Sequence, residues 1–377
     1  MRRPPVGTSA DGPERPRSKL AVVAAGGTGG HLFPAQALAQ ALVSRGWRVV
    51  LATDERVQTL SASFPAERRI PLSAATFKPG DPLGAVKAGG AILRGVMQAR
   101  AELAALRPAV VIGFGGYPSL PALLAAISQR RKTIIHEQNA VMGRANRLLA
   151  PFVTEIACAF PTLQKAPAKV AARAVVVGNP VRPEIRALYD KPYEPPTDEL
   201  RLLVTGGSQG ARLLSETVPK AVARLPEALR GRLKVQQQTR AESIEGAKST
   251  YAAADVDAEI APFFEGMAAR LGVAHLMIGR AGAGTVCEIA VAGRPAILVP
   301  LKIALDDDQG QNAHLLVDVG AAEVLREDAL SPESLAAALQ RLLGDPAKLA
   351  AMADAAHAVA SPDAADRLAD LVEATAA

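Results

Sequence analysis

A histidine follows a run of glycines near the start of the chain, in the segment Gly26-Gly27-Thr28-Gly29-Gly30-His31. A buried strand is predicted before this segment and a helix over 35–44 after it. Such a turn leaves backbone N–H groups free at the positive end of a helix dipole, where anions bind. The pattern is not G-x-G-x-x-G, because Leu32 stands at the third glycine position, and it lacks the Lys-Ser/Thr of a P-loop. We therefore expect an anion site with a titratable side chain at its mouth.

His31 is the candidate for proton transfer in this turn, because a neutral imidazole can accept a proton from a hydroxyl group. The positive end of the helix dipole disfavours an imidazolium ion, so we expect the ring to stay neutral. A capping or packing role is the alternative for a histidine that opens a helix.

Two more glycine-rich turns are predicted between a strand and a helix, at Gly206-Gly207-Ser208-Gln209-Gly210-Ala211 and around 282–284. Each is expected to offer backbone N–H donors to phosphate oxygens, and Ser208 adds a hydroxyl donor. One such turn alone often serves only packing, but several at corresponding positions of both halves favour phosphate binding.

Parallel sheets are the elements that would position these turns. Short apolar runs alternate with helical stretches from Lys19 onwards, which is typical of an α/β chain with helices on both faces of a parallel sheet. A proline-rich segment over 191–198 interrupts this alternation, which restarts at Leu200. The predicted strands are 20–25, 48–52, 110–113, 133–136, 155–157, 174–177, 200–205, 234–237, 258–260, 275–278, 296–299 and 322–324, and the predicted helices include 35–44, 85–106, 119–128 and 212–225.

Two domains follow from this organisation. We expect a disordered basic leader over 1–18, an N-terminal domain over 19–185, a linker over 186–198 and a C-terminal domain over 199–360, with a last helix over 361–377 packed back on the N-terminal domain. Two doubly wound domains that face each other across a cleft form either a clamp of the periplasmic-binding type or a GT-B glycosyltransferase. In both, the ligand lies beyond the carboxyl ends of the strands.

The composition narrows the classes of protein further. Two cysteines, Cys158 and Cys287, give no disulfide or metal pattern, so we expect a reducing cytoplasm. We see no secretion signal and no run of about 20 apolar residues. The net charge of +6 is compatible with nucleic acid or with an anionic membrane surface.

Six motifs occur in order along the chain: Gly26-Gly27-Thr28-Gly29-Gly30-His31, Gly113-Phe114-Gly115-Gly116-Tyr117, His136-Glu137-Gln138-Asn139, Gly178-Asn179-Pro180-Val181-Arg182, Gly206-Gly207-Ser208-Gln209-Gly210-Ala211 and Gly282-Ala283-Gly284-Thr285-Val286-Cys287-Glu288. Together they resemble the MurG family, the peptidoglycan N-acetylglucosamine (GlcNAc) transferases of GT-B fold, over about residues 19–360. The resemblance implies transfer of GlcNAc from UDP-GlcNAc to the muramyl 4-hydroxyl of lipid I (undecaprenyl-pyrophosphoryl-MurNAc-pentapeptide), which gives lipid II. It also implies inversion of the anomeric centre, no metal and no other cofactor.

The resemblance assigns site residues as well. It implies that Glu288, expected early in a helix that starts near Thr285, holds the ribose hydroxyls, whereas a plain helix-terminal charge is the alternative. It places Arg182 at the diphosphate, Phe264 near uracil, and Asn139 and Gln309 at sugar hydroxyls. The other implied donor-binding residues are Thr28, Gly29, Gly30, Ser208, Ala283, Gly284 and Thr285, and the implied acceptor-binding residues are Gly115, Gly116 and Tyr117.

Membrane contact is expected from the segment 77–100, where apolar residues alternate with cations at helical spacing. Arg130-Arg131-Lys132 could extend this surface, and an ordinary core helix is the alternative. We therefore expect peripheral attachment at the cytoplasmic face of the inner membrane. The expected partners are UDP-GlcNAc, lipid I, an anionic membrane surface and other cell-wall synthesis and division proteins, but no nucleic acid.

Other classes of function remain open at this point. Another GT-B glycosyltransferase or a UDP-GlcNAc 2-epimerase would share the two-domain fold, and the epimerase would need acidic residues placed for proton abstraction at C2. A dehydrogenase would require G-x-G-x-x-G after the first strand, which this chain lacks. A non-enzymatic sugar-binding clamp would normally be exported.

Overall fold

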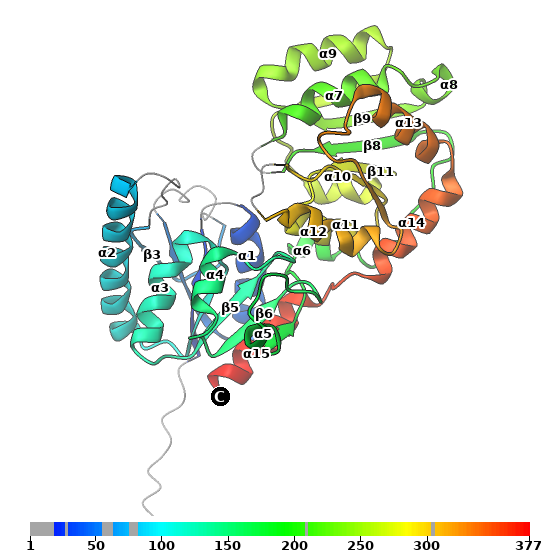
Figure 1. Cartoon of the computed structure of the whole chain (residues 1–377). Coiled ribbons are helices and arrows are strands. Elements are labelled where there is room, and N and C mark those ends of the chain that lie inside the picture. Colours follow the sequence, from blue (N-terminus) through cyan, green and yellow to red (C-terminus); the bar gives the residue numbers. More distant parts are fainter. Residues whose placement is uncertain (1–18, 27–28, 55–62, 75–81, 208–209, 303–305) are drawn as a thin grey trace, which may run out of the picture.

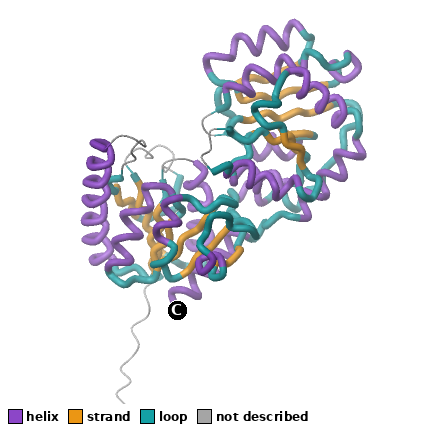
Figure 2. Tube along the Cα trace, viewed as in Figure 1, coloured by secondary structure: helices purple, strands orange, loops and turns teal. Residues whose placement is uncertain are grey.

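Two α/β lobes make up the chain, as a computed structural model shows (Figures 1 and 2). The structure describes residues 19–26, 29–54, 63–74, 82–207, 210–302 and 306–377, so the expected leader over 1–18 lies outside the described residues. Each lobe holds one sheet in which every described strand pair is parallel, with helices on both faces. The expected fold class, two doubly wound parallel-sheet domains, is confirmed.

The N-terminal lobe contains a seven-stranded sheet of order β3-β2-β1-β4-β5-β6-β7. Its first strand along the chain is apolar throughout because both of its faces are buried: Leu20 and Val22 belong to one core cluster, Ala21 and Val23 to the other. The strands are β1 Leu20–Ala24, β2 Arg48–Thr53, β3 Arg68–Pro71, β4 Val110–Gly113, β5 Thr133–Glu137, β6 Glu155–Cys158 and β7 Ala174–Val176. The helices are α1 Gly29–Ser44, α2 Pro82–Leu106, α3 Gly116–Ser128, α4 Arg144–Leu149, α5 Ala168–Ala171 and α6 Pro183–Arg186.

The C-terminal lobe contains a six-stranded sheet of order β10-β9-β8-β11-β12-β13. Its first strand is likewise buried on both faces, with Leu202 and Val204 in one cluster and Leu203 in the other. The strands are β8 Leu200–Thr205, β9 Leu233–Gln238, β10 Asp257–Ala261, β11 Leu276–Gly279, β12 Ala296–Leu298 and β13 Ala322–Val324. The helices of this lobe are α7 Arg212–Val222, α8 Glu227–Arg230, η2 Ala241–Ser243, α9 Ile244–Ala253, α10 Met267–Val273, α11 Ala283–Ala292, α12 Asp308–Val317, α13 Pro332–Leu343 and α14 Pro346–Ala358, and the chain ends with α15 Ala364–Ala376.

The strand order reverses once in each sheet, between β1 and β4 in the N-terminal lobe and between β8 and β11 in the C-terminal lobe. Ligands of doubly wound sheets bind in the crevice outside the carboxyl ends of the strands at such a reversal. The loops that follow these four strands carry the glycine motifs of the sequence. The topology therefore places those motifs where a ligand is expected.

Four helices begin earlier than the sequence predicts: α2, which begins at Pro82 and not at residue 85, and three helices that follow glycine motifs. The helix α1 begins at Gly29 and not at residue 35, so His31 lies in its first turn. The helix α3 begins at Gly116 and not at residue 119, and α11 begins at Ala283 and not near Thr285. For these three helices the sequence analysis assigned the glycines to the turn before the helix. In the structure the glycines lie at the junction where the turn becomes the helix.

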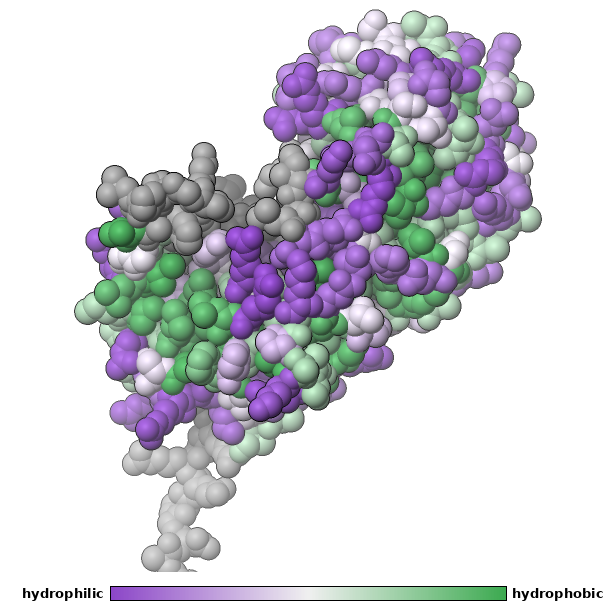
Figure 3. All heavy atoms as spheres, viewed as in Figure 1, coloured by the Kyte–Doolittle hydropathy of each residue, from purple (hydrophilic) through white to green (hydrophobic). Residues whose placement is uncertain are grey.

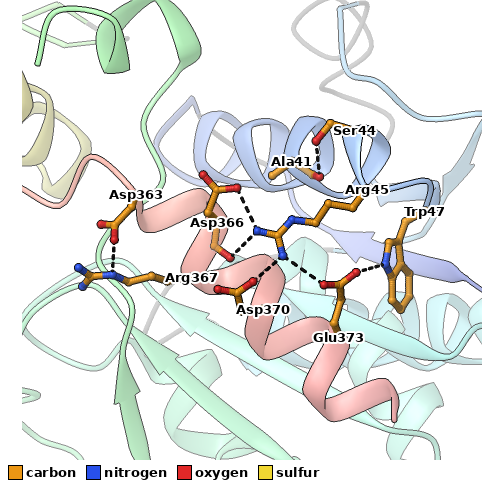
Figure 4. Close-up of polar contacts among 9 residues, drawn as sticks. All are labelled: Ala41, Ser44, Arg45, Trp47, Asp363, Asp366, Arg367, Asp370 and Glu373. Carbon is orange, nitrogen blue, oxygen red and sulfur yellow. Dashed lines mark hydrogen bonds and ion pairs between the residues drawn. The ribbon is translucent and has the colours of Figure 1, made fainter. Parts of the chain in front are cut away.

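The last helix, α15, crosses back and packs on α1 of the N-terminal lobe (Figures 1 and 4). Its buried face, with Leu368 and Val372 at 0% exposure, joins the same core cluster as β1. On its rim, Arg45 forms ion pairs with three carboxylates of α15, those of Asp366, Asp370 and Glu373 (Figure 4). The end of the chain thus completes the core of the lobe with which the chain begins.

Among the helices of the described part of the chain, none combines the length and the apolar character needed to cross a membrane.

Candidate functional site

His31 lies in the first turn of α1, directly over the start of α3. An added Cβ on Gly116 would lie 3.3 Å from the His31 Nε2 atom, and one on Gly115 would lie 3.7 Å from its Cε1 atom. Both glycines have a positive φ, 78° at Gly115 and 69° at Gly116, which other residues rarely adopt. Only glycine therefore fits both the backbone and the ring above it. The structure brings His31, Gly115 and Gly116 together, while the neighbouring Tyr117 packs partly buried against the lobe's core.

The loop after β5 reaches His31 from the other side. The Nδ1 atom of His31 lies 3.0 Å from the Oε1 atom of Gln138. The buried carboxylate of Glu137 shapes this loop, because it accepts hydrogen bonds from the backbone N–H groups of Asn139 and Gly143. An internal carboxylate thus holds the loop rigid beneath the histidine.

Arg182 connects the two lobes next to α1, the helix that carries His31. Its Nε and Nη2 atoms donate to Oε1 of Glu288 on α11 at 3.2 and 3.1 Å. Its Cζ atom lies 5.0 Å from the ring centroid of Phe33 on α1. Burial raises the pKa of the Glu288 carboxyl, and the charge and hydrogen bonds of Arg182 act in the opposite direction. Arg182 is therefore a cation held between α1 of the N-terminal lobe and α11 of the C-terminal lobe.

The start of α11, the helix that carries Glu288, supplies N–H donors. Gly282 precedes the helix, and Ala283, Gly284 and Thr285 form its first turn, whose N–H groups have no acceptor within the helix. An added Cβ on Gly284 would meet nothing within 4 Å, so the approach to these groups is open. Glu288 lies in the second turn, not in the first as the sequence predicted. A plain attraction to the helix terminus therefore explains its position less well.

The glycine loop after β8 differs from expectation. The N–H group of Gly206 donates to Oε1 of Gln238, that of Gly207 to Oγ1 of Thr205 and that of Gly210 to the Gly207 carbonyl. These three N–H groups already have acceptors, in the loop itself and at the ends of β8 and β9, so they are not free for phosphate as the sequence suggested. Ser208 lies outside the described residues, as does Thr28 of the first glycine loop.

A buried asparagine joins the two lobes. The Oδ1 atom of Asn312, which is 0% exposed, accepts from the Ala140 N–H group at 2.8 Å. Its Nδ2 atom donates to Oδ1 of Asn139 at 3.0 Å and to the Ala281 carbonyl at 3.3 Å. The loop after β5, the loop after β11 and the helix α12 therefore meet at one side chain.

Gln309 lies one turn earlier on α12. Its Oε1 atom accepts from the Leu301 N–H group at 3.0 Å, which leaves the amide NH₂ group as the part that can donate to a ligand. Phe264 lies after β10, and its ring is 3% exposed with the Arg270 Cζ atom 4.1 Å from its centroid. The structure thus leaves the Gln309 NH₂ group able to donate but keeps the Phe264 ring within the lobe.

Two functional contacts were missed by the sequence assignments. Gln138 belongs to the quoted motif His136-Glu137-Gln138-Asn139 and Asn312 lies three residues after Gln309, yet only the structure shows that Gln138 contacts His31 and that Asn312 links the lobes. Arg147 and Asp306 form a further pair between the lobes, at 3.3 Å. The signal that could have indicated them is the abundance of amide side chains beside the glycine motifs. Within the described residues, no group of three or more His, Cys, Asp or Glu side chains is arranged to hold a metal ion.

Two family models match this chain: the glycosyltransferase family 28 N-terminal domain over residues 21–158 and its C-terminal domain over residues 201–368. The chain is 69% identical, over 95% of its length and 99% of the relative, to the UDP-N-acetylglucosamine--N-acetylmuramyl-(pentapeptide) pyrophosphoryl-undecaprenol N-acetylglucosamine transferase of Phenylobacterium zucineum. The crystal structure of Acinetobacter baumannii MurG is 32% identical with a TM-score of 0.76, over 94% of this chain and 99% of that one.

A UDP-GlcNAc 2-epimerase from Neisseria meningitidis also superposes, with a TM-score of 0.66 over 94% of this chain and 99% of that one. Its sequence identity is 12%, so this likeness concerns the fold alone.

Proposed function

This chain belongs to glycosyltransferase family 28, and from that premise we propose that it transfers GlcNAc from UDP-GlcNAc to the 4-hydroxyl of the muramyl sugar of lipid I, giving lipid II for peptidoglycan. The observation that carries the proposal is that Arg182 contacts Glu288 of α11 and the ring of Phe33 on α1, the helix whose first turn holds His31. In this proposal a base on the N-terminal lobe and a nucleotide site on the C-terminal lobe face one another.

The transfer is a single displacement in this proposal. His31 takes the proton of the acceptor hydroxyl, whose oxygen attacks the anomeric carbon while the bond from that carbon to the UDP oxygen breaks with its electron pair. In a single displacement the acceptor oxygen approaches the anomeric carbon from the face opposite to the departing UDP oxygen. The anomeric centre is therefore inverted.

The leaving diphosphate gains negative charge, which must be stabilised. The first-turn N–H groups of Ala283, Gly284 and Thr285 at the positive end of α11, together with the guanidinium of Arg182, are suited to this task. Preorganised donors of this kind can lower an activation barrier by about 3–4 kcal/mol each. We therefore propose that these groups carry the stabilisation without a metal ion.

The donor's other parts have candidate contacts nearby. Glu288 is proposed to accept hydrogen bonds from the ribose hydroxyls, and the NH₂ group of Gln309 to donate to a sugar hydroxyl. Asn139 is proposed to reach the sugar from the opposite lobe. The family resemblance adds Ser208 and the turn Thr28-Gly29-Gly30 at the donor, Phe264 at uracil and Tyr117 at the acceptor.

We also propose peripheral attachment to the cytoplasmic face of the inner membrane. The outer face of α2 exposes Val86 at 73%, Leu93 at 63% and Met97 at 65%. Apolar residues gather over α2, α3 and α4 on the face shown in Figure 3. Exposed Lys87 and Arg94 lie on the same helix, which suits an anionic lipid surface that carries the acceptor.

The test is an incubation of the full chain with radiolabelled UDP-GlcNAc and a lipid I analogue. The proposal expects UDP release that depends on the acceptor, label in the lipid product, and the same rate after treatment with EDTA. UDP release without acceptor, or formation of N-acetylmannosamine, would instead support an epimerase. A rate that EDTA abolishes and a divalent ion restores would contradict the metal-independent step.

The role of His31 has its own test. We expect His31→Gln to lower kcat by about 10²–10⁴, the usual contribution of a general base, with UDP-GlcNAc affinity retained. His314→Gln is the matched control, because the His314 side chain is 54% exposed on α12 and pairs with Asp318.

A further inference from the structure

Three side chains and one carbonyl form a continuous line of hydrogen bonds beneath the proposed base. His31 Nδ1 lies 3.0 Å from Gln138 Oε1, and Gln138 Nε2 lies 3.0 Å from His136 Nδ1. His136 Nε2 lies 2.9 Å from the carbonyl oxygen of Gly178. The line starts on the backbone before Arg182 and ends on the ring of His31.

The proton positions along this line follow from its fixed end. A carbonyl oxygen can only accept, so the Nε2 atom of His136 must carry its proton. His136 is 0% exposed, and burial lowers its pKa to about 4, so near neutral pH the ring is neutral and its Nδ1 atom bears no proton. That Nδ1 atom must then accept, which requires the NH₂ group of Gln138 to point toward His136.

The orientation of Gln138 is fixed a second time by its own surroundings. Its Nε2 atom also donates to the backbone carbonyl of His136 at 2.9 Å. Gln138 is 2% exposed, so water cannot substitute for these partners. With the NH₂ group held in this way, only the Oε1 atom faces His31, and the Nδ1 atom of His31 must donate to it.

We propose that Gln138 is a positioning residue that fixes His31 in the tautomer with its proton on Nδ1, so that the lone pair of Nε2 is the proton acceptor. This inference rests on the proposed function, in which His31 is the base. In the reaction the acceptor O–H bond breaks and its proton moves to Nε2, which leaves an imidazolium ion that Gln138 still holds through Nδ1–H. The new glycosidic bond forms at the acceptor oxygen, and the electron pair of the broken anomeric bond departs with UDP.

The glycine floor supports the same geometry. Gly115 and Gly116 leave room for the ring at the start of α3, and His31 Nε2 is among the atoms nearest to an added Cβ on Gly116. The ring is thus held from below by glycine backbone and at its Nδ1 edge by an amide. A neutral histidine without such an acceptor can place its proton on either nitrogen.

The direct test reads the tautomer by nuclear magnetic resonance. The full chain is labelled with nitrogen-15 histidine, and its five histidines are assigned with single variants that include His31→Gln. We expect the His31 Nδ1 atom to carry the proton in the wild-type protein and to lose this preference in Gln138→Met. A wild-type His31 with its proton on Nε2, or an unchanged tautomer in Gln138→Met, would overturn the inference.

Kinetics give a second readout. Since the preferred tautomer affects proton transfer and not donor binding, Gln138→Met should lower kcat by about 10- to 100-fold and change KM for UDP-GlcNAc by less than about twofold. Gln237→Met is the matched control: Gln237 is also buried, at 0% exposure, and bonds the Tyr251 hydroxyl in the C-terminal lobe, far from His31 in the fold. A kcat equal in both variants would overturn the inference.

A milder variant protects the test against misfolding. Gln138→Asn keeps the amide but is one methylene too short to reach both rings, so it should show the same loss of tautomer preference. Failure of the proposed function is distinguishable, because the wild-type protein would then form no lipid product whatever tautomer the spectrum shows.

Discussion

The guanidinium of Arg182 and the carboxylate of Glu288 are the charged pair at the centre of the proposed donor site. Their side chains are 23% and 20% exposed, so each is partly removed from water and relies on the other. Burial raises the pKa of Glu288, whereas Arg182 lowers it and Glu184 raises it slightly. The ionisation of Glu288 thus depends on a neighbour that is also proposed to contact the diphosphate.

Arg182→Met should therefore change the pH dependence of donor binding. With Arg182 gone, burial raises the pKa of Glu288 further, so the carboxylate is lost at a higher pH as the solution is acidified. Calorimetric titration of UDP-GlcNAc across acidic to neutral pH should show weaker binding, by about 10- to 100-fold, and an acidic midpoint displaced upward.

The control for this prediction is Arg186→Met, which removes an exposed cation four residues away that pairs with Asp190. It should leave the midpoint unchanged. An Arg182 variant with weaker binding but an unmoved midpoint would show that Glu288 does not bind the donor as a carboxylate.

Residue types at the site could be predicted from sequence, but their partners could not. His31, Arg182 and Glu288 were all singled out by motif. The Gly206 and Gly207 N–H groups donate to the side chains of Gln238 and Thr205. The orientations of these two side chains depend on the strands around them. The link from Gln138 to His31 spans 107 residues of sequence and has no local signature.

At the scale of elements, the start of α3 is the support on which the proposed base lies. Gly116 combines a positive φ of 69° with close contact to the ring of His31. Gly46, in the turn after α1, has a similar φ of 77° but nothing within 4 Å of an added Cβ. Substitutions at these two glycines therefore distinguish the effect of backbone strain from the effect of contact with His31.

Gly116→Ala should therefore cost activity beyond its cost in stability. Both Gly116→Ala and Gly46→Ala are expected to destabilise folding by about 1–2 kcal/mol, because alanine is strained in the left-handed region. Only Gly116→Ala should lower kcat, by roughly tenfold or more, since it displaces the ring. Thermal unfolding and steady-state kinetics of both variants test this prediction. Equal kcat values in the two variants would count against a catalytic role for His31 at this position.

The packing of α15 provides the second prediction at this scale. Leu368 is 0% exposed in the core cluster of the N-terminal lobe, whereas Asp370 is 69% exposed in its pair with Arg45 (Figure 4). Leu368→Ala should destabilise the protein by about 2–5 kcal/mol, and Asp370→Asn by less than about 1 kcal/mol. Urea unfolding measures both, and the reverse order would show that the ion pairs hold the helix.

The elements themselves were largely predictable because parallel strands with two buried faces are continuous apolar runs. The exception is β3, Arg68–Pro71, which has only Ile70 buried and lies at the edge of its sheet. An edge strand with two arginines carries no apolar run to recognise. The early starts of α1, α3 and α11 were missed because glycine disfavours helices in general but is accepted in a first turn.

For the whole molecule, the exposed apolar face of α2 leads to a prediction about membranes. The full chain should sediment with vesicles that contain anionic lipid, and less so at high salt, because cations flank the apolar residues. Leu93→Glu should weaken the association by roughly tenfold, since one leucine contributes about 1.5–3 kcal/mol when buried. Val273→Glu, at an apolar residue 49% exposed on the C-terminal lobe, is the control and should have no effect.

Two lobes with a base on one and a nucleotide site on the other are the central claim of this account. A crystal structure of the protein with UDP-GlcNAc tests it most directly. We expect the diphosphate at the start of α11 beside Arg182, the ribose on Glu288, and the anomeric carbon turned toward His31. A diphosphate bound elsewhere, outside the gap between α1 and α11, would contradict the account.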